Sequence, residues 1–458
     1  MKKYNSIYFI GIGGISMSGL AELMLEKGVR VIGSDRNTNL SIEKLIKNGA
    51  KIHTGHAASN IEKVDLVVYT AAISQDNVEL LEAKRLGLPT FERSEFLGML
   101  MEDYKYNICI AGTHGKTTTT SMISSIFIED EKDPTIMVGG DLDLINGNMR
   151  PGSSEYFIAE SCEYRDSFLK FHPHLAIITN IESDHLDYFK DITQILNSFN
   201  AFASLTPEDG GLVTNAEDAN ARIIIKNFPG NLITFGLKSG DVHANNIVFN
   251  DSGFPNFDVV YKNDLYINVS LSVVGYHNIL NSLAAIAASI FFNIDKLSIV
   301  QGLKQFKLPH RRFQCIGEIN GIKVLDDYSH HPTEISAVIS SLKNMKSNEI
   351  YMVFQPHTYT RTKALYDDFC KCFNGLDNLH LIITDIYAAR EKDPLDINSE
   401  MLVNSIKNEG LDCLYIKEFN DIIKFLSEKS QKNDLVITVG AGDVNKIGQM
   451  FLKDAIDK

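Results

Sequence analysis

The sequence predicts an α/β protein of three domains, and three observations carry this prediction. The chain has 458 residues, and at roughly 150 residues per domain this length fits about three domains. Hydrophobic residues make up 44% of the chain and charged residues 22%, which supplies enough apolar side chains for several cores. Short runs of β-type residues alternate with helical periodicity, a pattern typical of parallel sheets covered by helices.

The charge and the apolar pattern exclude several classes of partner. The chain carries 44 Lys and Arg against 58 Asp and Glu, a formal net charge of −14, so we expect no nucleic acid partner. The longest strongly apolar stretch, residues 283–292, is about half of the roughly 20 residues that a membrane-spanning helix needs. We therefore expect a cytoplasmic protein with no membrane partner. Six cysteines without a CxxC pair favour incidental thiols over a zinc site or a disulfide framework.

The first predicted domain covers residues 1–106. A β-type run is followed by a glycine loop at residues 11–14 and then by a helical stretch that starts near Met17. This strand–loop–helix–strand order is the opening of a doubly wound, Rossmann-like sheet. The strands that we expect in this domain cover residues 7–10, 29–35, 66–69 and 89–91.

The first glycine loop has an incomplete dinucleotide-binding pattern. Gly11 and Gly13 occupy the first and third positions of Gly-x-Gly-x-x-Gly, but the sixth position is Ser16. Asp35 ends the next strand, about where an acid would bind a ribose. A glycine turn that only packs a helix on a strand explains the loop equally well. If a ligand binds here, NAD or another nucleotide diphosphate would suit the free N–H groups of the helix.

The second predicted domain covers residues 107–307 and opens with a stronger signal. The strand 108–111 leads into Gly112-Thr-His-Gly-Lys-Thr117, and a helical run follows to Ile128. Backbone N–H groups of such a loop wrap phosphates, Lys116 can reach the β and γ oxygens, and the Thr117 hydroxyl can bind Mg²⁺. The loop departs from the Walker A pattern, because Ile110 stands where the earlier glycine would be. We predict a P-loop-type, ATPase-like parallel sheet.

Two further side chains of this domain follow strand ends. Glu160 follows the strand 156–159, and His185 follows the strand 175–179. Ligands collect at the carboxyl ends of parallel strands, and a carboxylate there could hold Mg²⁺. A histidine is a less expected ligand for so hard a cation, and a hydrogen-bonded loop histidine is the alternative. Residues 231–275 read as a small antiparallel patch.

The third predicted domain, residues 308–458, is again Rossmann-like α/β, with strands expected at 350–354, 379–384 and 435–439. Two dense polar clusters follow strands and suggest a site. These clusters are Asp326-Asp-Tyr-Ser-His-His-Pro332 and Gln355-Pro-His-Thr-Tyr-Thr-Arg361. Other polar groups have plainer readings: His277 and Asn278 as a capped helix start, Arg311 and Arg312 as a solvated turn, and His53 and His56 as surface residues.

Taken together, seven motifs occur in order across the three predicted domains. They are Gly11-Ile-Gly-Gly-Ile-Ser-Met-Ser-Gly19, Ala111-Gly-Thr-His-Gly-Lys-Thr-Thr-Thr-Thr120, Thr179-Asn-Ile-Glu-Ser-Asp-His-Leu-Asp187, His277-Asn278, Arg311-Arg-Phe-Gln314, Asp326-Asp-Tyr-Ser-His-His-Pro332 and Phe354-Gln-Pro-His357. With these motifs the chain resembles the Mur ligase family from end to end. The resemblance implies an enzyme of peptidoglycan precursor synthesis that uses ATP and Mg²⁺. ATP would phosphorylate the lactyl carboxylate of UDP-N-acetylmuramate, and the amine of L-alanine would attack the acyl phosphate.

The resemblance also implies a role for individual residues. The UDP-sugar would bind Gly13, Gly14, Ile15, Ser16, Met17, Asp35, Thr70 and Ala71. ATP would bind Gly112, Thr113, His114, Gly115, Lys116, Thr117, Thr118, His277, Asn278, Asn281, Arg312 and Asp327. Magnesium would bind Thr117, Glu160 and His185. The incoming amino acid would meet Tyr328, His330, His357 and Arg361. Lys116, His114, His330 and Arg361 would be catalytic, and no general base is assigned.

Three departures and three alternatives accompany this prediction. Glu163 lies in a segment that differs from the more acidic form common in the family, Thr358 stands where many relatives carry Arg, and no carbamylated Lys can be placed. The nearest alternative is a sibling ligase that adds a recycled tripeptide to the same UDP-sugar. An NAD-dependent dehydrogenase would leave Lys116 unexplained, and a nucleotide-binding regulator would leave the third-domain cluster unexplained. We expect a monomer or a weak homodimer.

Overall fold

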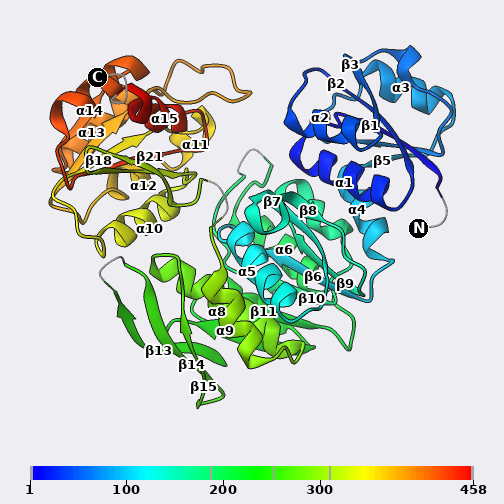
Figure 1. Cartoon of the computed structure of the whole chain (residues 1–458), viewed down its shortest axis with the longest axis horizontal. Helices are drawn as coiled ribbons and strands as arrows, with labels where there is room; N and C mark the ends of the chain where they lie inside the picture. The colour runs from blue at the N-terminus through cyan, green and yellow to red at the C-terminus, as the bar shows by residue number, and fades with distance from the viewer. Residues whose placement is uncertain (1–3, 186–187, 251–252, 309–310, 455–458) are drawn as a thin grey trace. The chain divides into compact units, whose positions relative to one another are not determined.

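The computed structural model describes residues 4–185, 188–250, 253–308 and 311–454, and the chain forms two compact units. Figure 1 shows the three sheets with their helices, and these confirm the predicted α/β class. Four residues of the sequence prediction lie outside the described part: Leu186, Asp187, Pro309 and His310. One unit contains Met1–Asn245, Asp258–Val269 and Leu280–Phe306; the other contains Asn246–Phe257, Ser270–Ile279 and Lys307–Lys458. Among the described helices, none is both long and apolar enough to cross a membrane.

The N-terminal sheet is parallel throughout, with strand order β3-β2-β1-β4-β5. Its strands are β1 (Ser6–Ile10), β2 (Arg30–Asp35), β3 (Lys51–Thr54), β4 (Leu66–Tyr69) and β5 (Thr90–Glu92). Its helices are α1 (Ile15–Glu26), α2 (Leu40–Lys47), α3 (Val78–Arg85) and α4 (Arg93–Met101). Side chains alternate between the faces of a strand: Ile7 and Phe9 join one core, whereas Tyr8 and Ile10 join another. The strand order reverses between β1 and β4, which is where ligands bind in doubly wound sheets.

The central sheet has the order β15-β14-β13-β12-β11-β10-β6-β9-β7-β8. Its strands are β6 (Tyr106–Ala111), β7 (Thr135–Leu142), β8 (Gly147–Arg150), β9 (Tyr156–Glu160), β10 (Leu175–Ile178), β11 (Gly211–Asn215), β12 (Asn231–Gly236), β13 (Val242–Phe249), β14 (Pro255–Tyr261) and β15 (Asp264–Ser270). Its helices are α5 (Lys116–Glu129), α6 (Ile192–Ala203), α7 (Ala221–Asn227), α8 (Tyr276–Phe291) and α9 (Lys296–Gln305). Helix α5 packs closely on α9, and the Ser125 hydroxyl donates a hydrogen bond to the Gly302 carbonyl at 2.7 Å.

The edges of the central sheet differ from the sequence prediction. We expected residues 231–275 to form an antiparallel patch, but β12 runs parallel to β11 and β13 runs parallel to β12. The prediction is therefore wrong for residues 231–243. Short runs with Asn and Gly turns resemble hairpins, yet here they continue a parallel sheet. At the opposite edge, β7 and β8 form an antiparallel hairpin that the pattern did not predict.

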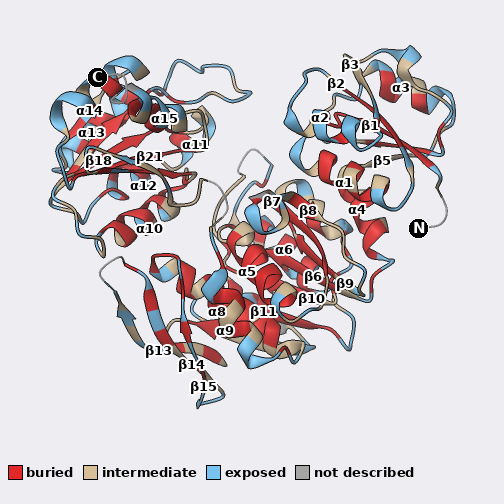
Figure 2. Ribbon diagram, in the orientation of Figure 1, coloured by how far each residue is buried: buried red, intermediate tan, exposed pale blue. Residues whose placement is uncertain are grey.

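The C-terminal sheet has the order β16-β17-β21-β18-β19-β20, and only the edge strand β16 is antiparallel to its neighbour. Its strands are β16 (Gln314–Ile319), β17 (Ile322–Asp327), β18 (Ile350–Phe354), β19 (Leu379–Ile383), β20 (Cys413–Tyr415) and β21 (Leu435–Val439). Its helices are α10 (Pro332–Leu342), α11 (Tyr359–Ala364), α12 (Tyr366–Lys371), α13 (Ser399–Asn408), α14 (Phe419–Lys429) and α15 (Asn445–Asp454). In Figure 2 the inner strands of this sheet, such as β18 and β21, are buried, and the side chains of the sheet belong to two separate cores.

Candidate functional site

The first glycine loop is held by its own backbone and by Asp35. Gly11 and Ile12 donate their N–H groups to the Ser34 carbonyl at 2.8 and 3.0 Å, and Gly13 donates to Asp35 Oδ2 at 2.9 Å. Gly11 has φ +81°, and a Cβ there would lie 2.7 Å from Thr70 Cγ2. The structure thus brings the predicted residues of the β1 loop and of the β4 end together at the switch point of the sheet.

A buried carboxylate binds the side chain of Ser34, the residue whose carbonyl anchors this loop. Glu79 has no exposed surface and accepts from the Tyr8 hydroxyl at 3.0 Å, from Ser34 Oγ at 2.5 Å and from Asn60 Nδ2 at 2.8 Å. His56 Nδ1 lies 2.8 Å from Glu79 Oε2, and the His56 side chain is only 10% exposed. The prediction of His56 as a surface residue is therefore wrong. A histidine in a polar loop looks exposed in sequence when its partner comes from a distant helix.

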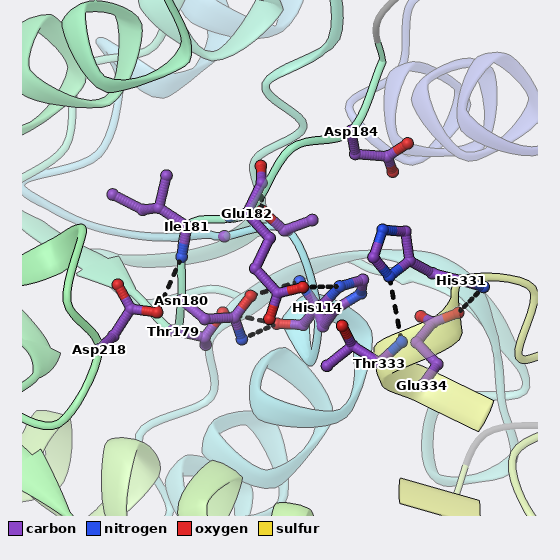
Figure 3. Close-up of polar contacts among 12 residues, drawn as sticks. His114, Thr179, Asn180, Ile181, Glu182, Asp184, Asp218, His331, Thr333 and Glu334 are labelled. Carbon is purple, nitrogen blue, oxygen red and sulfur yellow. Dashed lines mark hydrogen bonds and ion pairs between the residues drawn. The ribbon is translucent and has the colours of Figure 1, made fainter. Parts of the chain in front are cut away.

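The second glycine loop is shaped by the segment that follows β10. Figure 3 shows Thr179 and Asn180 against the backbone of His114. The Asn180 side chain accepts from His114 N at 2.8 Å and donates to His114 O at 3.0 Å, and Thr179 Oγ1 donates to the same carbonyl at 2.6 Å. Gly112 has φ +134°, and a Cβ there would overlap the Thr179 hydroxyl. Only glycine fits at this position.

Glu182 also contacts the second glycine loop, at Thr113 and His114. Its N–H donates to Thr113 Oγ1 at 2.8 Å, and its carboxylate lies 3.4 Å from His114 Nε2 (Figure 3). Asp218 accepts from Ile181 N at 3.5 Å, and burial raises the pKa of this carboxyl. The motif that begins at Thr179 therefore holds the second glycine loop in its conformation.

Lys116 points to a carboxylate that the sequence left uncertain. Its Nζ lies 3.0 and 3.2 Å from the two oxygens of Glu163 and donates to Thr113 O at 3.1 Å and to Gly112 O. Glu163 is buried, with a side chain 3% exposed. Burial acts to lower the pKa of Lys116, but Glu163, Cys162 and Glu160 together outweigh it, with Glu163 the largest of the three, so the net shift is upward. Lys116 therefore keeps its charge in the interior.

The three predicted metal ligands lie around the same loop. Glu160 Oε2 accepts from Gly139 N at 2.8 Å, and a Cβ on Gly140 would lie 3.8 Å from Thr117 Cγ2. A Cβ on Gly139 would lie 2.5 Å from Glu160 Oε1, so glycine at this position of β7 leaves room for the Glu160 carboxylate. The oxygen donors of Thr117 and Glu160 suit Mg²⁺. His185 lies further along, with Nε2 3.8 Å from Glu163 Oε1.

The residues expected at adenine fall in two groups. Asn281 accepts from Thr119 Oγ1 at 3.3 Å, and a Cβ on Gly115 would overlap its amide oxygen, so Asn281 packs on the start of α5. In the other unit, Asn278 Nδ2 donates to Val274 O at 2.7 Å. Burial, helped by the Arg312 charge, lowers the pKa of His277 to about 4. His277 is therefore neutral at physiological pH.

In the C-terminal domain the two neighbouring arginines have different environments. Arg311 donates to Asp326 Oδ2 at 3.0 Å, to Gly440 O at 2.7 Å and to Gly442 O at 3.1 Å. It therefore ties together the ends of β17 and β21, and the reading of a solvated turn is wrong for it. Arg312 lies 3.7 Å from Glu334 Oε1.

Asp327 and His331 organise the start of the polar cluster. Asp327 accepts from Phe313 N at 2.6 Å and from Ser329 N at 2.8 Å, and burial raises the pKa of its carboxyl against the effect of Arg312. His331 caps α10 in a reciprocal box with Glu334 (Figure 3). Both side chains thus fix the chain direction after β17.

Four residues predicted to meet the amino acid come together. The rings of Tyr328 and His330 lie 5.6 Å apart, and those of His330 and His357 lie 5.7 Å apart. Arg361 Nη1 lies 3.2 Å from His357 Nδ1. Tyr387 stacks on His357, a partner that sequence reasoning missed. In the sequence, Tyr387 stands out only by its position just after a strand, and many polar residues have such a position.

Comparisons with known proteins agree with the motifs. Residues 6–105 match the model of the Mur ligase family catalytic domain, residues 110–289 the Mur ligase middle domain and residues 311–442 the Mur ligase glutamate ligase domain. The chain belongs to the Mur ligase family of ATP-dependent ligases, and the resemblance inferred from the motifs is confirmed.

Individual relatives match nearly the whole chain. The chain is 51% identical to UDP-N-acetylmuramate–L-alanine ligase of Clostridium tetani over 99% of both chains, and 52% identical to that of Clostridium acetobutylicum over 97% of both. A crystal structure of UDP-N-acetylmuramate–alanine ligase from Thermotoga maritima matches with a TM-score of 0.82, 29% identity and 99% coverage of both chains. A murein peptide ligase from Psychrobacter arcticus shares the fold, with a TM-score of 0.69 and 23% identity over 98% of both chains.

Proposed function

We propose that this chain joins L-alanine to the lactyl carboxylate of UDP-N-acetylmuramate, with cleavage of ATP to ADP and phosphate, in peptidoglycan precursor synthesis. The observation that carries the proposal is the identity of about half of all residues, over 97% or more of each chain, with relatives named for this reaction. The protein acts in the cytoplasm as a monomer or a weak homodimer.

The second glycine loop performs the phosphoryl transfer. A carboxylate is a poor electrophile until one oxygen becomes a good leaving group, so ATP first converts it to an acyl phosphate. Catalysis of this step depends on placing cations against the developing negative charge. Lys116 exchanges the Glu163 carboxylate, 3.0 Å away, for the β and γ oxygens of ATP. His114 faces the carboxylate of the sugar substrate.

Thr117, Glu160 and His185 hold the magnesium ion. When it is bound, Mg²⁺ neutralises charge on the phosphates. The hydroxyl of Thr117 and the carboxylate of Glu160 are the oxygen donors that this cation prefers. His185 completes the set by analogy with the family, through water or directly. Removal of the cation with a chelator should abolish phosphate release.

The remaining residues hold the other substrates. Gly13, Gly14, Ile15, Ser16 and Met17 bind the diphosphate of the UDP-sugar through backbone N–H groups, while Asp35, Thr70 and Ala71 line the nucleoside. His277, Asn278 and Asn281 meet adenine, and Arg312 and Asp327 bind the nucleotide from the third domain. Tyr328, His330, His357 and Arg361 surround the amino acid, whose amine attacks the acyl phosphate to give the amide and inorganic phosphate.

Phosphate release from ATP tests the proposal directly. The assay contains UDP-N-acetylmuramate and, in separate reactions, L-alanine, glycine, L-serine or the cell-wall tripeptide. We expect release that requires the UDP-sugar and is fastest with L-alanine, with formation of UDP-N-acetylmuramoyl-L-alanine seen by mass spectrometry. Release stimulated only by the tripeptide would overturn the alanine assignment. Release that is indifferent to the UDP-sugar would overturn the ligase reaction itself.

A further inference from the structure

The link between His357 and α11 has a strained backbone. Thr358 has φ +66° and ψ 143°, a region that is nearly closed to residues other than glycine and is worst for β-branched side chains. Such a conformation is unfavourable and persists only where the surroundings enforce it. Thr358 lies between His357 and the helix that carries Arg361, so the strain sits inside the predicted amino-acid site.

The segment that follows β19 enforces this conformation through the backbone. Thr358 N donates to Tyr387 O at 2.9 Å, and Tyr387 N donates to Pro356 O at 2.8 Å. These bonds form an isolated parallel bridge between His357 and Tyr387. The chain on both sides of Thr358 is therefore fixed by one residue of a loop that is about 30 positions away in the sequence.

Glu391 fixes the first turn of α11 in the same way. Its Oε2 accepts from Tyr359 N at 2.6 Å and from Thr360 N at 3.0 Å, and its Oε1 accepts from the Thr360 hydroxyl. These N–H groups have no partner within the helix, and a carboxylate also suits the positive end of a helix. Glu391 thus sets the direction of the helix that presents Arg361.

The ring of Tyr387 completes the contact. It stacks on His357 with the ring centroids 5.6 Å apart and the planes at 22°. A Cβ on Gly442 would lie 2.7 Å from Tyr387 Cγ, and Arg311 Nη1 donates to the Gly442 carbonyl at 3.1 Å. Glycine at 442 leaves the space that Tyr387 occupies.

The contact with Arg361 determines the tautomer of His357. A guanidinium can only donate hydrogen bonds, so His357 Nδ1, 3.2 Å from Arg361 Nη1, is the acceptor. The ring proton therefore lies on Nε2. His357 in this position acts as a hydrogen-bond donor through Nε2 and does not serve as a base through Nδ1.

We propose that residues 386–391, here called the clamp, position His357 and Arg361 for the amino-acid substrate, with Tyr387 and Glu391 as the positioning residues. The clamp rests on the proposed function, because it assigns a purpose within the amino-acid site. Tyr387 acts through the His357 ring and its backbone bridge, and Glu391 acts through the first turn of α11. Together they hold a strained link that would otherwise relax and separate His357 from Arg361.

Steady-state kinetics of the full-length enzyme test the clamp. Tyr387→Leu and Glu391→Ala should each raise the KM for the amino-acid acceptor about tenfold or more, with the KM values for ATP and the UDP-sugar within twofold of the wild type. Tyr387→Phe keeps the stacked ring and should rescue the acceptor KM to within about twofold. Glu409→Ala, on an exposed helix end of the same domain, is the control and should change nothing.

Amide hydrogen exchange of residues 355–365 measures, without any substrate, whether the clamp holds this segment. Glu391→Ala should speed the exchange of the Tyr359 and Thr360 amides at least tenfold, whereas Glu409→Ala should not. Faster exchange with an unchanged acceptor KM would overturn the positioning role, and unchanged exchange with unchanged kinetics would overturn the clamp. Equal rises of all three KM values with a lower Tm would assign these residues to folding alone. If the wild type responds to no acceptor, the proposed function fails, while exchange still decides whether Glu391 holds α11.

Discussion

The two glycine loops share one architecture and differ in what supports them. Each follows a buried strand and precedes a helix, β1 and α1 in one case and β6 and α5 in the other. Residues 11–17 contain neither Lys nor Arg. Their anchor Ser34 binds the buried hydrogen-bond network of Glu79 and His56. The second loop carries Lys116, which is paired with the buried Glu163.

This difference matches two different tasks for a phosphate. A diphosphate that is only held needs N–H donors and the helix N-terminus, which both loops provide. A phosphoryl group that is transferred develops charge in the transition state and needs a cation placed against it. The support of the first loop thus fixes shape, whereas the support of the second also stores a positive charge in the interior.

Removal of Lys116 should produce the largest effect and separate the loops most sharply. Lys116→Ala removes the one Lys or Arg among residues 112–117, so we expect turnover to fall by about 10³-fold or more. The affinity for UDP-N-acetylmuramate, measured by calorimetry, should stay within about twofold. Lys132→Ala, which removes a partly exposed lysine that pairs with Asp130, is the control. Loss of turnover and of UDP-sugar binding together would mean that the loops do not serve separate ligands.

The sequence predicted both loops because their signals are local. A strand, glycines and a helix lie within about 20 residues, and backbone geometry needs little from the rest of the chain. The supports could not be predicted, because they are long-range. His56 meets Glu79 across 23 positions, and Lys116 meets Glu163 across 47. A carboxylate in a loop does not reveal whether it is buried or paired.

The same reason explains the other misses. The hairpin-like runs after residue 231 continue a parallel sheet, because register and direction are decided by β11 and not by the local turns. Arg311 looked solvated, yet it contacts Gly440 and Gly442 after a strand more than 120 positions later. The predicted cluster around His330 did assemble, because consecutive strand ends of a parallel sheet meet at one edge.

Removal of Glu79 tests whether the first loop depends on the buried hydrogen-bond network as a structural support. Glu79→Ala leaves the side chains of Tyr8, Ser34 and Asn60 without their buried acceptor, which should lower the free energy of unfolding by about 3 kcal/mol. Denaturant unfolding measures this change. Glu82→Ala, which removes a partly exposed residue of the same helix that pairs with Arg85, should change stability far less. A stable Glu79→Ala protein would show that the network is dispensable.

Paired glycine substitutions compare the two loops at matched positions. Gly11→Ala places a Cβ 2.7 Å from Thr70 Cγ2, and Gly112→Ala places one against the Thr179 hydroxyl, both at positive φ. We expect the first variant to raise the KM for the UDP-sugar and the second to raise the KM for ATP, each by about tenfold to 100-fold. Gly28→Ala, with positive φ and open space, controls for backbone strain alone. Both variants affecting the same substrate would contradict the separation of the loops.

The smallest effect should appear in the pH profile of Glu163→Gln. Burial acts to lower the pKa of Lys116, and Glu163 is the main group that opposes it. Without that charge, Lys116 should lose its proton at a lower pH than in the wild type. Because the charged form serves phosphoryl transfer and Glu163 faces Lys116 before ATP binds, the alkaline limb of the kcat/KM profile for ATP should move down by about one pH unit or more. Glu163→Asp keeps the charge and should move it less. An unchanged alkaline limb in Glu163→Gln would mean that the second loop, like the first, relies on Glu163 for shape and not for charge.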